Sequence, residues 1–222
     1  MKPECRILYQ DNDHSIILKP AGMATHGRGT NTLLNHVQNA CGPFSPDTWK
    51  PLHRLDYGTR GPVVFAHTMP AYLALERDWS RNTKIYHAWH VGQWKTARGL
   101  VAISLKGKRS ETRFRCLGSR SWGVHGIASL VEWAPLSGRT HQIRRHAAAV
   151  GHPIVGDSVY GTPPVYKGYG LHLTCTYFSW IHPMTEERME VTVPPAKKMR
   201  RVVQNTFMPE TTSPWLTLFE SS

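Results

Sequence analysis

One carboxylate in this sequence, Asp56, is surrounded by basic side chains. It follows His53 and Arg54 and precedes Arg60, in a glycine-containing segment that leads into an apolar, strand-like run. Neighbouring cations keep a carboxylate ionised at neutral pH, which is the form that acts as a nucleophile or a base. A salt-bridged loop aspartate is the simpler explanation, and this segment alone does not exclude it. Asp56 is therefore the first candidate for a catalytic residue.

A second basic segment, residues 137–146, runs from a glycine-containing loop into a predicted helix. Positions three and four apart share one face of a helix. On that basis the residues expected to pack inward are Ile143, Ala147 and Val150. Arg139 and Arg144 would then point into a groove together with His141. A solvated basic face is the alternative that this pattern leaves open.

A third segment places Lys84, Tyr86 and Ala88 on one face of a predicted strand, because side chains alternate along a strand. A tyrosine beside basic groups can stack on a nucleobase and present its hydroxyl group. A tyrosine in the core or at a sheet edge is the alternative. The segment therefore offers Tyr86 as a candidate for contact with a base.

The charge balance narrows the range of partners. The chain has 222 residues, with 27 lysines and arginines against 15 aspartates and glutamates, and its formal net charge is +12. This excess predicts a polyanionic partner, with nucleic acid first and an anionic membrane surface second. The alternative is a basic protein whose charge only aids solubility. No apolar run approaches the ~20 residues of a membrane span and no signal peptide is recognisable, so we expect a cytoplasmic protein.

The cysteines and histidines do not predict a metal centre or a disulfide framework. The four cysteines are widely scattered and form no Cys-x-x-Cys pair. The thirteen histidines show neither metalloprotease nor zinc-finger spacing. We therefore expect neither a metal nor a disulfide.

The elements that must position these residues alternate irregularly. Strands are predicted at residues 7–9, 15–19, 62–67, 85–91, 100–105, 111–117, 127–133, 171–181 and 189–193. Helices are predicted at residues 32–40, 70–79, 141–150 and 196–205. Asn31 is expected to cap the first helix, and Tyr72, Leu73 and Leu75 to bury one face of the second. Runs of strands with few inserted helices predict an α+β fold on a mostly antiparallel mixed sheet, with flanking helices and a central cleft.

Together these segments resemble the RluA-type family of RNA pseudouridine synthases. The family's His-Arg-Leu-Asp motif with a following threonine is matched by residues 53–56 and Thr59, and its Gly-Arg-Thr-His-Gln-Ile-Arg motif by residues 138–144. Further matches, in the family's order, are Lys19-Pro20-x-Gly22 with His26, Lys84-x-Tyr86-x-Ala88, residues 151–157 with Tyr160-Gly161, Leu171-His172 and His182-Pro183. The resemblance implies one catalytic domain, which we place at residues 1–208 before a tail at 209–222. Because the sequence begins almost at this domain, we expect the S4-like domain of some relatives to be absent.

The resemblance implies a reaction in which a uridine within RNA is detached from its ribose, rotated and rejoined through a ring carbon, without a cofactor. Asp56 would be the catalytic carboxylate, acting by covalent attack or by abstraction of a ribose proton. Arg144 would pair with it, and Tyr86, the third catalytic residue, would stack on the target base and help the final proton removal. Arg54 would fill the space left by the extruded base, and Ile143 would form an apolar wall of the pocket.

Six further side chains are expected to contact the substrate. They are His53, Thr59, Arg60, Arg139, His141 and Gln142. Arg60 stands where the family usually has a small residue, and His90 and Leu173 are departures as well. Because Arg60 follows Asp56 closely, we expect it to contact an RNA phosphate. An arginine that points to solvent or pairs with a carboxylate is the alternative.

The expected substrate is a stem-loop of transfer RNA or large-subunit ribosomal RNA, because base extrusion is easiest in loops and weak stems. The protein is expected to act as a monomer. The main alternative is a non-catalytic RNA-binding protein on the same fold. A metal-dependent nuclease would need clustered carboxylates, and a membrane-surface protein a long basic amphipathic helix, and the sequence shows neither.

Overall fold

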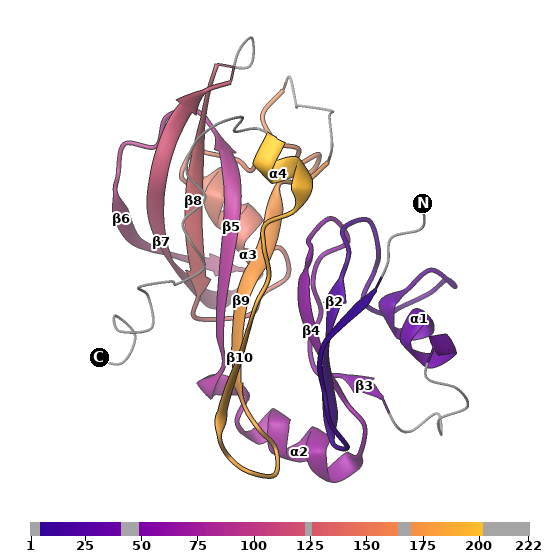
Figure 1. The fold of residues 1–222 in the computed structure, drawn as a ribbon. Helices are drawn as coiled ribbons and strands as arrows, with labels where there is room; N and C mark the ends of the chain where they lie inside the picture. The colour runs from indigo at the N-terminus through magenta and orange to yellow at the C-terminus, as the bar shows by residue number, and fades with distance from the viewer. Residues whose placement is uncertain (1–4, 41–48, 123–125, 164–169, 202–222) are drawn as a thin grey trace.

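Two antiparallel sheets form the body of the protein in a computed structural model, which describes residues 5–40, 49–122, 126–163 and 170–201 (Figure 1). The smaller sheet has the strand order β1-β2-β4-β3 and the larger one β10-β9-β5-β8-β7-β6. The strands of the smaller sheet are β1 (Arg6–Gln10), β2 (His14–Lys19), β3 (Lys50–Pro51) and β4 (Gly61–Ala66). Those of the larger sheet are β5 (Thr83–Val91), β6 (Arg98–Leu105), β7 (Lys108–Ser121), β8 (Ile127–Pro135), β9 (Leu173–Ile181) and β10 (Arg188–Thr192).

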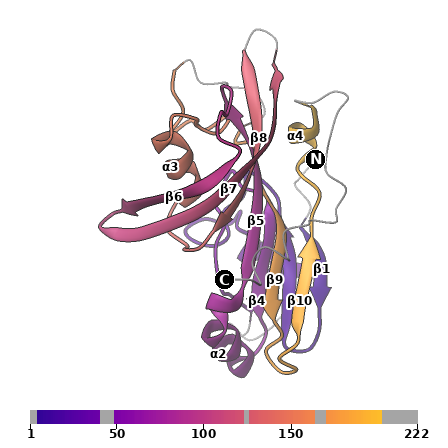
Figure 2. The same ribbon diagram turned by 90° about the vertical axis from the view of Figure 1, so that its left-hand side faces the viewer.

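Helices flank the two sheets (Figures 1 and 2). α1 (Leu33–Ala40) lies beside the smaller sheet, whereas α2 (Met69–Arg77) and α4 (Lys197–Arg201) lie at opposite ends of the molecule. A short 3-10 turn, Trp79–Arg81, connects α2 to β5. α3 (Gln142–Ala149) packs against β6, β7 and β8. None of the helices in the described part of the chain is long and apolar enough to cross a membrane.

The two sheets meet where β4 begins beside β9. The backbone of Arg60 forms a parallel bridge with Thr174, and the amide of Cys175 donates a hydrogen bond to the carbonyl of Arg60 at 2.8 Å. A Cβ atom at Gly61 would lie 2.5 Å from the Cβ atom of Cys175, so this close approach requires glycine. Because Asp56 precedes this junction by only a few residues, the junction sets its position relative to the larger sheet.

One apolar core spans the two sheets and α3. It contains Ile17 and Val63 from the smaller sheet, Trp133 from the larger sheet and Ala147 from α3, all with at most a few per cent of their surface exposed. Burial of apolar surface across the junction is the main force that holds the sheets together. The two sheets therefore form a single domain.

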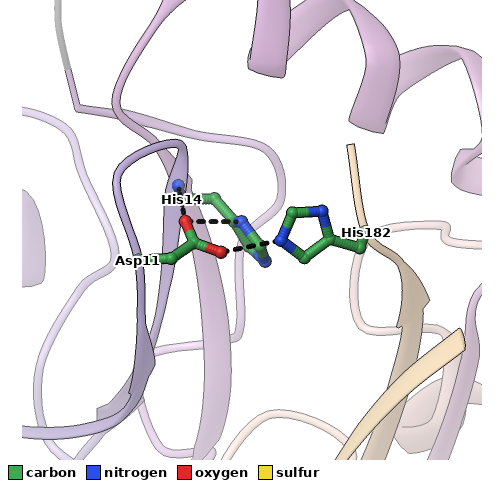
Figure 3. Close-up of side chains that lie close together, drawn as sticks. All are labelled: Asp11, His14 and His182. Atoms are coloured by element: carbon green, nitrogen blue, oxygen red, sulfur yellow. Dashed lines mark hydrogen bonds and ion pairs between the residues drawn. The ribbon is translucent and has the colours of Figure 1, made fainter. Parts of the chain in front are cut away.

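A polar clamp of Asp11, His14 and His182 joins the sheets a second time (Figure 3). The carboxylate of Asp11, in the turn between β1 and β2, is hydrogen-bonded to Nε2 of His182 at 2.8 Å. Its other oxygen lies 3.2 Å from Nδ1 of His14, whose Nε2 accepts the indole N–H of Trp180 at 2.8 Å. Because His182 directly follows β9, the clamp ties the β1–β2 turn to the end of that strand.

The predicted α+β class is confirmed, and each strand and helix predicted within the described residues is present close to its expected bounds. The two-residue strand β3 was not predicted. Residues 202–205 of the last predicted helix and the tail at 209–222 lie outside the described residues. The proposed boundary of the catalytic domain at residue 208 therefore stays a prediction.

Three local predictions are wrong. The hydroxyl of Thr32, not Asn31, caps α1, because it accepts a hydrogen bond from the amide of Asn35 at 3.2 Å. Leu73 is 56% exposed, because the buried face of α2 is formed by Ala71 and Leu75. Val150 is 40% exposed, because it caps the end of α3 and no longer follows the helical spacing of the buried positions.

We predict that the fold loses stability as the pH falls from about 6.5 to about 4. Burial lowers the pKa of His14 to about 4, with the charge of Asp11 opposing this shift and those of His182 and His67 adding to it. A folded-state pKa below the unfolded value means that the unfolded chain binds more protons, so the stabilisation is complete above pH 6.5 and is lost as His14 is protonated. Urea unfolding at a series of pH values measures this.

The control for this prediction is His14→Gln, whose amide oxygen keeps an acceptor for the indole of Trp180. The variant should lose part of the pH dependence but not all of it, because burial also lowers the pKa of His90 to about 3 and that of His172 to about 4. An identical pH dependence in the variant and the wild type would contradict the assignment to His14.

Candidate active site

A cavity of about 710 Å³ opens between the segment before β4, the segment that leads into α3 and the face of β5. Its lining includes ten of the eleven side chains predicted from the sequence. They are His53, Arg54, Asp56, Thr59, Tyr86, Arg139, His141, Gln142, Ile143 and Arg144. Arg60 does not line it. The fold therefore brings three distant sequence segments to one cavity.

The loop that carries Asp56 is supported through its backbone. The hydroxyl of Thr25 accepts a hydrogen bond from the amide of Leu55 at 3.1 Å and donates one to the carbonyl of Leu55 at 3.3 Å. The amide of Gly22 donates to the carbonyl of Tyr57 at 2.8 Å. The side chain of Leu55 is buried below the loop. Residues next to Asp56 on both sides are thus fixed by the segment that follows β2.

A fully buried lysine completes this support. Nζ of Lys19 donates hydrogen bonds to the carbonyls of Met23 at 2.7 Å, Pro20 at 2.9 Å and Tyr57 at 3.4 Å. These three acceptors use the three N–H groups of the ammonium. Burial lowers the pKa of Lys19 to about 8, while the negative charge of Asp56 works against that shift. Lys19 therefore adds positive potential beneath the carboxylate without contacting it.

The carboxylate of Asp56 lies between the guanidinium of Arg144 and the imidazole of His141, and it is not hydrogen-bonded to any described residue. Nη1 of Arg144 lies 3.8 Å from Oδ2, and Nε2 of His141 lies 3.8 Å from Oδ1. About a fifth of the Asp56 side chain is exposed. The expected pairing of Asp56 with Arg144 is present as an ion pair, and the carboxylate oxygens keep capacity for a substrate.

The hydrogen bonds of Arg144 go instead to Asp157. Its Nε and Nη2 atoms donate to the two oxygens of that carboxylate, each at 2.8 Å. Asp157 is 1% exposed and also accepts from the amides of Val159 and Tyr160. Burial opposes both charges, but the hydrogen bonds outweigh it, lowering the pKa of Asp157 and raising that of Arg144. The two-point contact fixes the guanidinium plane, so that Nη1 is directed at Asp56.

Gln142 is a support for the loop and has no polar group left for a substrate. Its Oε1 accepts hydrogen bonds from the hydroxyl of Ser137 at 2.7 Å and the amide of Arg139 at 3.0 Å. Its Nε2 donates to the carbonyl of Glu111 at 2.9 Å and the hydroxyl of Thr112 at 2.8 Å. The expected substrate contact through the Gln142 amide is therefore corrected to an anchor between β7 and the loop before α3.

His141 turns the chain into α3 in a left-handed conformation, with a φ angle of 54°. Its Nδ1 is hydrogen-bonded to the hydroxyl of Tyr160 at 3.1 Å, which leaves Nε2 directed at Asp56. Burial lowers the pKa of His141, with Asp56 opposing this and Arg144 adding to it. The ring therefore borders the carboxylate as a neutral group at neutral pH.

Tyr86 and Ile143 form an apolar side of the cavity opposite these charges. Tyr86 lies on β5, where it pairs with Trp133 of β8 and Cys175 of β9, and 9% of its surface is exposed. Burial, with the charges of Cys175 and Asp56 adding to it, raises the pKa of Tyr86 well above its usual value. Its phenol is therefore protonated at neutral pH, which suits stacking better than removal of a proton.

His53 and Thr59 lie at the cavity but are held by the protein. Nε2 of His53 accepts the amide of Val64 at 3.2 Å, and burial together with the charge of Lys84 lowers the pKa of His53 well below 6.5. The amide of Thr59 donates to the carbonyl of Asp56 at 3.0 Å, which closes a turn around that residue. Its buried hydroxyl has no hydrogen-bond partner among the described residues.

The three remaining arginines differ in their surroundings. Arg54 is exposed at the cavity, and so is Arg139, whose Nε lies 3.4 Å from the carbonyl of Arg109. The guanidinium of Arg60 donates to the carbonyl of Pro194 at 2.6 Å and lies outside the cavity. The structure thus gives Arg60 a partner in the protein, next to the junction of the sheets, and does not support the expected phosphate contact.

Sequence reasoning missed the roles of Asp157, Lys19 and Thr25. Asp157 and Lys19 are within the motifs that carry the resemblance, but a motif does not reveal that a residue pairs with another 13 positions away. Thr25 shows no sequence signal that could have indicated its bonds to Leu55. In each case the partner is set by the tertiary fold.

Asp11, His14 and His182 are the group of possible metal ligands found in the described ranges. A metal-bound histidine keeps a proton on its other ring nitrogen. In His14 that nitrogen accepts the indole N–H of Trp180, and in His182 it faces the amides of residues 184–185 at 3.2 Å each. In each ring the nitrogen that faces Asp11 therefore carries the proton. Nε2 of His182 is hydrogen-bonded to the carboxylate and Nδ1 of His14 lies 3.2 Å from it, so the group is a polar clamp.

Comparison with known proteins agrees with the geometry. The sequence model described as RNA pseudouridylate synthase matches residues 13–149. Ribosomal large subunit pseudouridine synthase C of Vibrio vulnificus is 32% identical over 90% of this chain and 68% of its own length. Uncharacterized RNA pseudouridine synthase YhcT of Bacillus subtilis is 31% identical over 92% of this chain and 73% of its own length. The structure of human RNA pseudouridylate synthase domain containing 1 is similar with a TM-score of 0.79, at 22% identity, over 100% of this chain and 98% of that one.

An antiparallel α+β fold with a carboxylate in a basic cavity, together with these matches, defines the class as RNA pseudouridine synthases, which isomerise uridine in RNA. Within that class the chain belongs to the RluA-type family, as its motifs predicted.

We predict that Arg144→Met destabilises the protein by about 3–5 kcal/mol, because it leaves the buried Asp157 carboxylate without its partner. Activity should fall as well, because Asp56 loses its nearest guanidinium. Urea unfolding and an activity assay measure the two effects. Arg145→Met on the same helix is the matched control and should unfold at nearly the wild-type urea concentration. Equal stability of the Arg144 variant and the control would contradict the role of the Asp157 pair.

We also predict that neither zinc nor a chelator changes the melting temperature, because both clamp histidines carry their protons toward Asp11. Thermal unfolding with added zinc, and separately with EDTA, measures this. A zinc-dependent rise in melting temperature that Asp11→Asn abolishes would show instead that the clamp binds metal.

Proposed function

We propose that this protein converts a uridine in a loop of large-subunit ribosomal RNA to pseudouridine, with Asp56 as the catalytic carboxylate. The observation that carries the proposal is the environment of Asp56. Its carboxylate is within 3.8 Å of Arg144 and of His141, has no hydrogen bond to a described residue, and stands in a cavity with Tyr86 and Ile143. In this arrangement the carboxylate oxygens are stabilised by a neighbouring positive charge and remain free to contact a substrate.

The reaction conserves every atom. The bond between N1 of uracil and C1′ of ribose breaks, a bond between C5 and C1′ forms, and the proton that C5 loses is balanced by one gained at nitrogen. Asp56 acts in the first step, either by attacking C1′ or by taking the proton of C2′. Because uridine and pseudouridine are isomers, the reaction needs no oxidant and no group donor.

The surrounding residues support this step. Arg144 holds the carboxylate in place and stabilises its negative charge, and Lys19 adds positive potential from below. Tyr86, with its protonated phenol, stacks on the uracil, and Ile143 closes the apolar side. Proton removal from C5 then falls to a carboxylate or to water, because a phenol with a raised pKa is a poor base at neutral pH.

The target nucleotide must leave its stack to reach Asp56. Arg54, exposed at the edge of the cavity, fills the space that the extruded base leaves. Extrusion costs about a few kcal/mol and least in unpaired RNA, so a uridine in a loop is the favoured target. Arg139, which is also exposed at the cavity, contacts the RNA backbone.

The choice of ribosomal RNA is supported by the relatives, several of which are named ribosomal large subunit pseudouridine synthase C. Transfer RNA is the alternative substrate.

We further propose a monomeric, cytoplasmic enzyme. Mapping of pseudouridines across all RNA in cells with and without the gene identifies the target, and loss of a ribosomal site in the deletion strain is the expected result.

Asp56→Asn tests the catalytic assignment. We expect turnover below about a hundredth of wild type, while RNA affinity changes by only a few-fold, because Asp56 acts on the transition state and not on binding. Single-turnover conversion and filter binding measure the two quantities. Asp13→Asn, in the turn between β1 and β2, is the matched control. A variant at Asp56 that retains more than that activity, with deamidation excluded by mass spectrometry, would overturn the assignment.

A further inference from the structure

Two aromatic rings of the cavity lining, those of His53 and Trp79, form a platform together with the buried ring of Phe178. The rings of His53 and Trp79 lie 5.2 Å apart, and those of His53 and Phe178 5.8 Å apart. Nζ of Lys84 lies over this platform, 4.3 Å from the centroid of Trp79 and 5.8 Å from that of Phe178. A half-buried ammonium group thus lines the cavity at a site that the reaction described above does not use.

Lys84 has no anionic partner in the described part of the chain. No carboxylate pairs with it and no described oxygen accepts a hydrogen bond from it, in contrast to Lys19 with its three carbonyl acceptors. Burial lowers the pKa of Lys84 to about 8, and the nearby thiol of Cys175, whose own pKa burial raises to about 12, is neutral and supplies no negative charge. Cation–π contact offsets part of the cost of desolvating an ammonium, and an anion would offset much more.

Lys84 stands apart from the reacting centre. It is two residues from Tyr86 on the same face of β5, a spacing of about 6.6 Å along a strand. The charge of Asp56 contributes to the pKa of Tyr86, whereas it does not contribute to that of Lys84. A uracil stacked on Tyr86 would therefore have its own backbone, rather than its reacting atoms, near Lys84.

We propose that Lys84 is a phosphate-binding residue, and that it holds the backbone phosphate next to the target uridine against the Trp79 platform. This rests on the proposed function, because the position of the uridine comes from Asp56 and Tyr86. The contact positions the RNA without reading its sequence. The Trp79 ring keeps the ammonium pointing into the cavity before RNA arrives, so little side-chain freedom is lost on binding.

The first test compares Lys84→Met with Lys84→Arg on a hairpin RNA that has a single loop uridine. The Met variant should bind at least about tenfold more weakly, the loss expected for a charge-assisted hydrogen bond. Its plot of log affinity against log salt should be flatter by about 0.7–0.9 of a unit. The Arg variant should recover most of both. Lys50→Met on β3, outside the cavity, is the matched control, and thermal unfolding shows that each variant is folded.

The second test identifies the group that Lys84 binds. Methylphosphonate, which lacks the charge, replaces the phosphate 5′ or 3′ of the uridine in the same hairpin. At one of the two linkages it should weaken wild-type binding as much as Lys84→Met does, and it should then have little further effect on the Met variant. Additive losses at both linkages would overturn the phosphate assignment.

The remaining outcomes are equally decisive. Unchanged affinity and salt slope for Lys84→Met would show that the lysine only packs on Trp79. A collapse of the single-turnover rate at saturating RNA, with affinity unchanged, would place Lys84 at the base and overturn the proposal. Both tests measure binding, so they remain readable even if wild type fails to form pseudouridine, which is the result that would overturn the proposed function instead.

Discussion

The buried pair of Arg144 and Asp157 is the interaction on which the active site depends. Two parallel hydrogen bonds fix the guanidinium plane, and Asp157 is itself held by two backbone amides. A buried ion pair adds little net stability to a protein compared with apolar packing, because desolvating both charges is costly. What this pair provides is a fixed orientation of the Arg144 guanidinium, which leaves its Nη1 atom facing Asp56. The cavity therefore has a fixed positive group without a competing hydrogen bond on the carboxylate.

The sequence was most informative where local pattern determines structure. The β5 face with Lys84 and Tyr86 and the inward-facing Ile143 and Ala147 follow from the periods of strands and helices, and the structure has them. The convergence of Asp56, Tyr86 and Arg144 in one cavity did not follow from spacing. It was implied by motifs in a fixed order, and the geometry agrees with it.

Where prediction failed, the deciding partner was distant in the chain. Gln142 fits the pattern of a polar residue at a substrate, but β7 uses its whole amide. Arg60 follows Asp56 closely, yet the start of β4 turns its side chain toward Pro194. Val150 fits the helical spacing on paper, but the helix has ended there. Each of these outcomes depends on which segments the sheets bring together, and sequence spacing does not contain that information.

The backbone support of the loop that carries Asp56 also determines which of its side chains can change. Thr25, Gly22 and Lys19 hold the loop only by its amides and carbonyls, so the shape around Asp56 is insensitive to the side chains at positions 54 and 57. Both of those side chains are exposed. The exposed side chains of this loop can therefore change in evolution while the position of the Asp56 carboxylate is preserved. One chemical apparatus can in this way be retargeted from one RNA to another by few substitutions, without a matching loss of stability.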